Sequence, residues 1–111
     1  MKIIKLKDII EEGVSHNPEI KKKIMIDNNQ FNNIMSFGHA KFTSNQKTTP
    51  HKHNDMDEIF FITKGSGIFH TEKHNKKVSK GDCISIPAKE IHWQSNPFKN
   101  DFEMIYFGVL I

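Results

Sequence analysis

The chain has 111 residues, a formal net charge of +3 and a sequence pI near 9.0. Its length suits a single domain, and a hydrophobic content of 36% is enough for a packed core, which excludes an intrinsically disordered chain. All the basic residues are lysines, so we interpret the run Lys21–Lys23 as solvated surface rather than as a nucleic-acid patch.

The first segment of the chain, residues 1–8, interrupts each short apolar run with a lysine. A signal-peptide core therefore does not form there, and no other stretch approaches the length needed to span a bilayer. The single cysteine, Cys83, excludes an internal disulfide and is compatible with a reducing compartment. We therefore expect a cytoplasmic protein without membrane or nucleic-acid partners.

The remaining chain alternates short apolar segments with turn residues. Residues 8–13 predict a short helix that ends at Gly13, and residues 15–18 predict a turn. Many short strands at nearly regular spacing are typical of an all-β sandwich or barrel. The predicted strands cover residues 20–26, 34–42, 48–53, 58–63, 67–72, 83–86, 91–95 and 102–109.

Four side chains have the chemistry of metal ligands. His51 and His53 stand two residues apart, so in a strand both imidazoles would face the same side. Glu58 can return to that side if the intervening turn starts an antiparallel strand, and His92 begins a later strand. Three neutral imidazoles and one carboxylate suit a borderline divalent transition metal.

These four residues belong to two spaced motifs, which cover residues 45–65 and 81–96. The first motif reads Thr49-Pro50-His51-Lys52-His53, followed by Glu58 and Gly65. The second consists of Gly81, Pro87, His92 and Asn96. Both motifs, in their residue types and spacing, resemble the two conserved motifs of the cupin superfamily.

The chain departs from the family pattern at two positions. Asn45 stands where the first motif usually opens with glycine, and asparagine tolerates the left-handed backbone that such a turn often needs. Lys89 stands where glycine usually follows the proline of the second motif, and its side chain is either incidental or attracts an anionic ligand. Neither position carries a metal ligand.

The resemblance implies one cupin domain over residues 1–111, with a conserved barrel core from about residue 30 to 111. It implies an all-β jelly-roll barrel of short antiparallel strands, which holds one divalent metal ion through His51, His53, Glu58 and His92. Iron, manganese, nickel and zinc all suit these ligands. Because small cupins commonly pair, the resemblance also implies a homodimer.

Four further residues are candidates for contact with a substrate. Tyr106, the only tyrosine, is a candidate general acid if it points into the barrel, and packs or forms an interface if it points outward. His39 lies on a strand face that we expect to point into the barrel, so it is a candidate acid–base group. Gln94 should face inward and either orients a ligand or fills the barrel, while Phe60 is a packing residue or a ligand contact.

Two classes of function remain open. The first is an enzyme that acts on a small molecule at the metal, of dioxygenase, isomerase or lyase type, and we favour it. The second is a non-catalytic binding protein, such as a sensor or accessory protein. The lack of arginine argues against a phosphorylated sugar or a tightly clamped dicarboxylate. Acid–base groups facing the metal would favour the enzyme, and wholly apolar walls would favour the binder.

Overall fold

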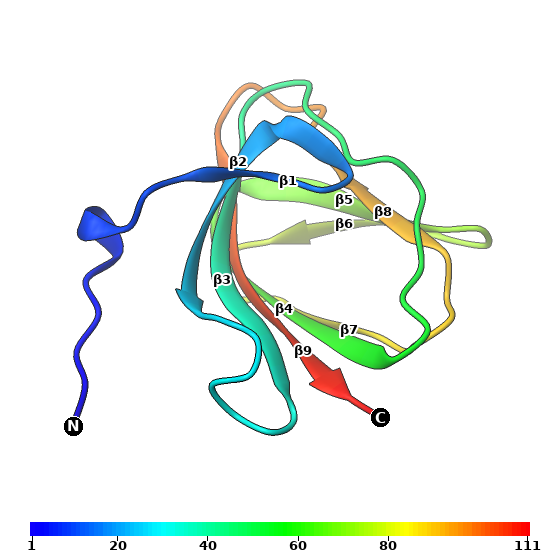
Figure 1. The fold of residues 1–111 in the computed structure, drawn as a ribbon. Helices are drawn as coiled ribbons and strands as arrows, with labels where there is room; N and C mark the ends of the chain where they lie inside the picture. Colours follow the sequence, from blue (N-terminus) through cyan, green and yellow to red (C-terminus); the bar gives the residue numbers. More distant parts are fainter.

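The computed structural model describes all of residues 1–111, and its regular secondary structure is almost entirely antiparallel strands (Figure 1). Its one helical element is the 3-10 turn η1 (Leu6–Asp8), and none of its helices has the length and apolarity to cross a membrane. The strands are β1 (Glu12–Val14), β2 (Asn17–Ile26), β3 (Ile34–Phe42), β4 (Met56–Lys64), β5 (Ser66–Thr71), β6 (Asn75–Ser79), β7 (Cys83–Ile86), β8 (His92–Ser95) and β9 (Phe102–Leu110).

The strands form two sheets that face each other across the core. The larger sheet has the order β1-β2-β3-β9-β4-β7, and the smaller has the order β6-β5-β8. Neighbouring strands are antiparallel in both sheets. This arrangement confirms the predicted fold class, an all-β jelly-roll barrel of short antiparallel strands.

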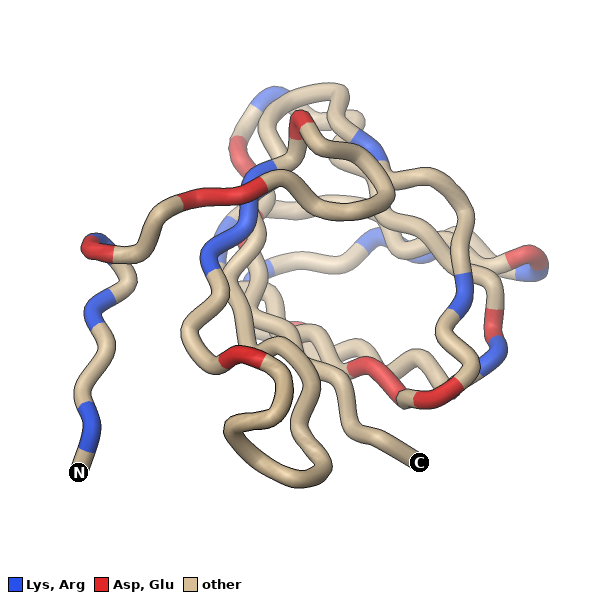
Figure 2. Tube along the Cα trace, viewed as in Figure 1, with Lys and Arg blue, Asp and Glu red and all other residues tan.

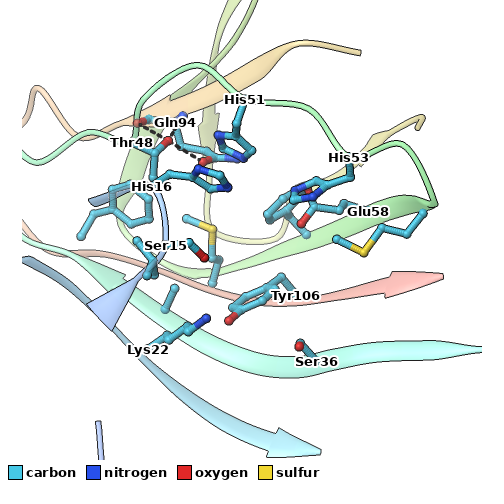
Figure 3. A pocket seen from close by; sticks show the side chains of 16 residues that line it. Ser15, His16, Lys22, Ser36, Thr48, His51, His53, Glu58, Gln94 and Tyr106 are labelled. Carbon is cyan, nitrogen blue, oxygen red and sulfur yellow. Dashed lines mark hydrogen bonds and ion pairs between the residues drawn. The ribbon is translucent and has the colours of Figure 1, made fainter. Parts of the chain in front are cut away.

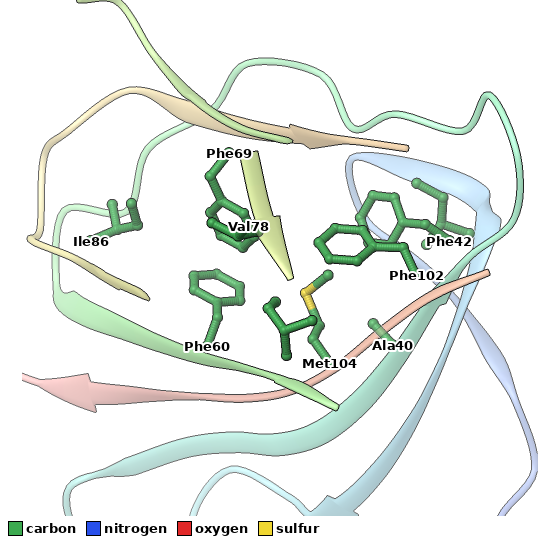
Figure 4. Close-up of a cluster of buried hydrophobic side chains, with 10 residues drawn as sticks. Ala40, Phe42, Phe60, Phe69, Val78, Ile86, Phe102 and Met104 are labelled. Carbon is green, nitrogen blue, oxygen red and sulfur yellow. The ribbon is translucent and has the colours of Figure 1, made fainter. Parts of the chain in front are cut away.

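Aromatic and aliphatic side chains fill the space between the sheets. Phe60 on β4 and Phe69 on β5 pack edge to face with ring centroids 5.0 Å apart, so they join the two sheets. Phe102 on β9 contacts the same cluster and is fully buried (Figure 4). Gly67 lies against the Phe102 ring, where a Cβ atom would overlap it. The core is therefore assembled from inward-facing residues of both sheets.

The predicted helix over residues 8–13 is wrong. Its first residue ends η1, whereas Glu12–Val14 forms β1 and pairs with β2. Gly13 permits this pairing, because a Cβ at that position would lie 2.6 Å from the Pro18 carbonyl oxygen. The pairing with β2 therefore overrides the weak local preference for a helix.

One predicted strand is absent, and one observed strand was not predicted. Residues 48–53 make only an isolated bridge between His51 and His92, beside a second bridge from Lys47. Pro50 has no N–H to donate, so a regular ladder cannot run through this segment. Strand β6 was not predicted, because Val78 is its only buried residue and the rest of it is polar.

A β-bulge in β3 decides which of its side chains face the core. Met35 pairs with Gly108 on β9, but the next pairing is Gly38 with Tyr106, so the register shifts between them. Ser36 within this stretch has a φ of 48°. After the bulge, Gly38 and Ala40 are buried on the inner face.

Candidate metal centre

The four predicted ligands meet at one place inside the barrel. His51 and His53 come from the segment between β3 and β4, Glu58 from β4 and His92 from the start of β8. One donor atom from each residue lies within 4.8 Å of all the others. Two backbone hydrogen bonds join His51 and His92, with N···O distances of 3.0 and 2.9 Å, so the two motifs are fixed to each other.

Backbone carbonyls orient two of the imidazole rings. Nδ1 of His51 lies 2.7 Å from the Thr49 carbonyl oxygen, and Nδ1 of His92 lies 2.9 Å from the Glu90 carbonyl oxygen. Because a carbonyl only accepts hydrogen bonds, each Nδ1 carries the proton and donates it. The Nε2 atoms are then the nitrogens available to a metal, which is a common arrangement around metal-bound histidines.

The Glu58 carboxylate lies between two of the histidines. Its Oε1 is 2.9 Å from Nε2 of His92 and 3.1 Å from Nε2 of His53. Burial acts to raise the pKa of Glu58, but the hydrogen bonds from His53 and His92 outweigh it and lower that pKa to about 2. Glu58 is therefore an anion at neutral pH, as a metal ligand must be.

The histidines differ in their protonation. Burial lowers the pKa of His51 to about 4, against the opposing effect of its hydrogen bond to Thr49. The hydrogen bond to Glu58 raises the pKa of His53, although burial opposes it. His51 is therefore neutral at pH 7 and presents a free lone pair, whereas Nε2 of His53 faces the Glu58 carboxylate.

The donor set fits a metal ion. Both ring nitrogens of the fully buried His92 face oxygen atoms, Nδ1 the Glu90 carbonyl and Nε2 the Glu58 carboxylate, each at 2.9 Å. A cation bound by Nε2 and by the carboxylate would satisfy both groups while Nδ1 still donates to the carbonyl. Three imidazoles and a carboxylate suit a divalent transition metal.

A cavity of about 190 Å³ adjoins this centre. Three of the four predicted substrate contacts, Phe60, Gln94 and Tyr106, line it (Figure 3). Gln94 accepts a hydrogen bond from the Thr48 hydroxyl at 2.9 Å, so its amide nitrogen is the atom left for a ligand. Whether these residues contact a substrate stays a prediction.

The structure settles the orientation of Tyr106, which points into the cavity. Gly38 makes room for it, because a Cβ there would lie 2.8 Å from the Tyr106 hydroxyl oxygen. Burial and the charge of Glu58 raise the pKa of Tyr106 above its ordinary value. The phenol therefore stays protonated and can donate a hydrogen bond.

The expected inward orientation of His39 is wrong. Its Nε2 lies 3.2 Å from the Glu103 carboxylate, and it is not among the cavity residues. The bulge at Ser36 explains the error, because the extra residue moves every later side chain of β3 to the opposite face. This contact with Glu103 places the His39 side chain on the outer face of the large sheet.

Several cavity residues were not predicted from the sequence. Ser15, His16 and Lys22 come from the hairpin of β1 and β2, which precedes both motifs. The His16 ring stacks on His51 with a centroid distance of 3.6 Å and an interplanar angle of 7°. Their local sequence contains no metal-site pattern, and only the folding of the hairpin over the barrel mouth brings them to the site.

A family model described as a cupin domain matches residues 38–108. The chain belongs to the cupin family. The matched region includes all four candidate ligands, while β1 and β2 of this cupin lie outside it. The small single-domain cupin expected from the two motifs is thereby confirmed.

Known proteins similar to this cupin include one of Methanocaldococcus jannaschii and one of Thermotoga maritima. An uncharacterized protein of Methanocaldococcus jannaschii is 32% identical over 93 residues, which cover 83% of this chain and 74% of that protein. An oxalate-binding protein of Thermotoga maritima is 26% identical over 80 residues, covering 72% of this chain and 66% of that protein.

The fold also matches a solved structure closely. The crystal structure of a predicted oxalate decarboxylase of Thermotoga maritima superposes with a TM-score of 0.91, covering 99% of this chain and 100% of that one. The two sequences are 22% identical. At this identity the likeness describes the fold, and the reaction has to be argued from the site.

Proposed function

We propose that this cupin is a metal-dependent enzyme that acts on a small molecule, with His51, His53, Glu58 and His92 as the metal ligands. One observation carries the proposal. The four donor atoms lie beside a cavity whose other walls bear the hydroxyl of Tyr106, the ring of His16 and the amine of Lys22. Groups that exchange or donate protons thus face the metal centre, as acid–base catalysis requires.

The residues of the cavity have separable roles in this proposal. A divalent metal, when bound, would act as a Lewis acid on a ligand oxygen. Tyr106 donates a hydrogen bond to the ligand, and Gln94 orients it with its amide nitrogen. Phe60 and Met104 form an apolar wall that limits water around the reacting group.

A non-catalytic binding function is the second candidate. The similar Thermotoga maritima protein is named for oxalate binding rather than for a reaction. If this cupin works in the same way, its cavity retains a small carboxylate without converting it. Oxalate is therefore the first compound to test for both functions, although the fold alone does not select it.

The test uses protein loaded with cobalt(II), whose absorption spectrum reports on its ligands, and with manganese(II). Oxalate should change the cobalt spectrum of the wild type, and an enzyme of this substrate class should consume it in the manganese form. A spectral change without consumption would support the binder. Protein that takes up neither metal would contradict both functions, whereas no spectral change with oxalate or with other small carboxylates would exclude a carboxylate ligand. His39→Ala, on the outer face, is the matched control and should behave as the wild type.

A further inference from the structure

One lysine of the basic run in β2 points into the cavity. The register pairs Lys22 with Ala40 on β3, and Ala40 with Met104 on β9, so the three side chains share one face of the large sheet. Ala40 and Met104 are buried in the core, and all three residues line the cavity. Lys21, one residue earlier, is exposed on the opposite face. The solvated-surface interpretation therefore fails for Lys22.

The positive charge of Lys22 has only a weak partner in the chain. The Glu12 carboxylate on β1 lies 3.9 Å from its Nζ, and Glu12 is 60% exposed, whereas Lys22 is 20% exposed. Ion pairs of this length at the surface contribute little. Figure 2 shows the basic stretch of β2 beside the acidic start of β1. A mostly buried ammonium group with so weak a partner is stabilised by an anion that lies closer to it.

The other end of the cavity does not supply that anion. Glu58 is the only acidic residue that lines the cavity, and His53 and His92 already bind its carboxylate. A bound divalent metal would make that end positive, because a metal ion is usually the largest local charge in its site. Lys89 was the other candidate for attracting an anionic ligand. Its side chain is exposed and does not line the cavity.

The Tyr106 hydroxyl is a second polar group beside Lys22 in the cavity. It lies on the same side of the cavity as Lys22, while His51 and His16 lie across from both (Figure 3). Gly38 and Ala40 are the small residues next to them on the inner face, and they leave space over the sheet. A cavity of 190 Å³ holds roughly six water molecules, so the ligand is small.

We infer that Lys22 and the Tyr106 hydroxyl bind the carboxylate of a small anionic ligand whose other end reaches the metal centre. Lys22 is thus a specificity-determining residue that selects anionic over neutral ligands. The contact between the ligand and the metal rests on the proposed function. The contact between the ligand and Lys22 does not require a metal. The hairpin of β1 and β2, outside the matched cupin region, then supplies part of the specificity of this protein.

Isothermal titration calorimetry with malonate and malonamide tests the inference, because the two probes have similar size but malonate is an anion and malonamide is neutral. Wild-type protein should prefer malonate in both its metal-free and zinc-loaded forms. Lys22→Met should weaken malonate binding about tenfold or more, as expected for a lost hydrogen bond between charged groups, and leave malonamide binding unchanged. Lys21→Met removes the same charge from the outer face and should bind both probes as the wild type.

The inference is overturned if Lys22→Met and Lys21→Met bind malonate equally. Lys22 would then be only an inward-pointing charge that protects the nearby sheet edge from pairing with another chain. It is also overturned if the wild type binds malonate no better than malonamide. Zinc content measured on the same samples separates the two proposals. Protein that takes up no zinc yet prefers malonate through Lys22 would contradict the metal function alone.

Discussion

At the scale of single residues, His51 has the most defined position in the metal centre. The Thr49 carbonyl fixes its Nδ1, the His16 ring covers one of its faces, and backbone hydrogen bonds join it to His92. Its position depends on strand pairing and packing that exist without a metal. The ring therefore contributes to metal binding and much less to folding.

His51→Ala should accordingly lower metal affinity by more than about a hundredfold, because the loss of a ligand exceeds that of an outer-shell partner. The β-rich circular dichroism spectrum should persist, since the apolar core between the sheets is untouched. Calorimetric titration with zinc and circular dichroism of the same samples measure the two effects. A variant that unfolds would identify the metal as structural and remove most of the support for an enzyme.

Tyr106→Phe removes a hydroxyl that faces the cavity and leaves the ring in place. Metal content should stay near that of the wild type, because Tyr106 is not in the ligand group. If the phenol is a general acid, turnover should fall about a hundredfold or more. The activity and metal content of His39→Ala should both match the wild type, and equal loss of activity in the two variants would argue against a specific role for Tyr106.

At the scale of secondary-structure elements, the ligand segment of residues 47–53 is held without a regular strand. Thr48 donates a hydrogen bond to the Gln94 side chain and accepts one from the Gln94 backbone N–H, both at 2.9 Å. Both residues are buried, so these bonds are protected from water. They tie the segment that carries His51 and His53 to β8.

Thr48→Val keeps the shape of the side chain and removes both hydrogen bonds. It leaves the Gln94 carbonyl oxygen without this partner, so we expect a loss of about 1–3 kcal/mol in the free energy of unfolding. Urea unfolding of the metal-free protein measures it, and metal affinity should also fall. Thr43→Val, at an exposed position, is the control. Equal stability of the two variants would show that the Thr48 hydrogen bonds do not hold the segment.

The sequence allowed some elements of the site to be predicted because their geometry is local. Asn45 adopts a φ of 68°, the left-handed conformation expected where the family usually has glycine, and Lys89 has a φ of 74°. By contrast, the bulge at Ser36 inverted the expected face of His39, because strand periodicity gives no sign of an inserted residue. The motifs thus identified the group of metal ligands. A bulge two strands away in the sheet changed which side chains face the cavity.

At the scale of the whole molecule, the position of the N-terminal hairpin was not predictable. His16 and Lys22 reach the cavity only because β1 and β2 extend the large sheet over the barrel mouth (Figure 1). This placement depends on contacts between distant parts of the chain. No local spacing encodes such contacts. The sequence pattern therefore predicted only a turn at His16 and a surface position for Lys22.

The outer face of the large sheet leads us to propose a homodimer. A wholly apolar recess there is formed by Ile26, Phe31, Ile34, Phe37 and Phe107. Phe31 is 57% exposed, which is unfavourable for a side chain facing water. A second copy that covers this recess would bury it in a self-complementary interface.

Light scattering should therefore give the mass of a dimer at micromolar concentration. Phe31→Glu should shift the protein toward the monomer, because it places a charge in the buried core of the interface. Glu72→Gln, at an exposed position outside the recess, is the control and should remain dimeric. A monomeric wild type at the same concentration would contradict the proposal.

The central claim is that His51, His53, Glu58 and His92 hold one metal ion, and elemental analysis tests it most directly. Protein reconstituted separately with iron, manganese, nickel and zinc, then freed of excess ions, should retain about one first-row transition metal per chain with at least one of them. His51→Ala, treated in parallel, should retain far less. A wild-type protein that retains none of the four metals, or a His51→Ala variant that retains as much as the wild type, would contradict the account.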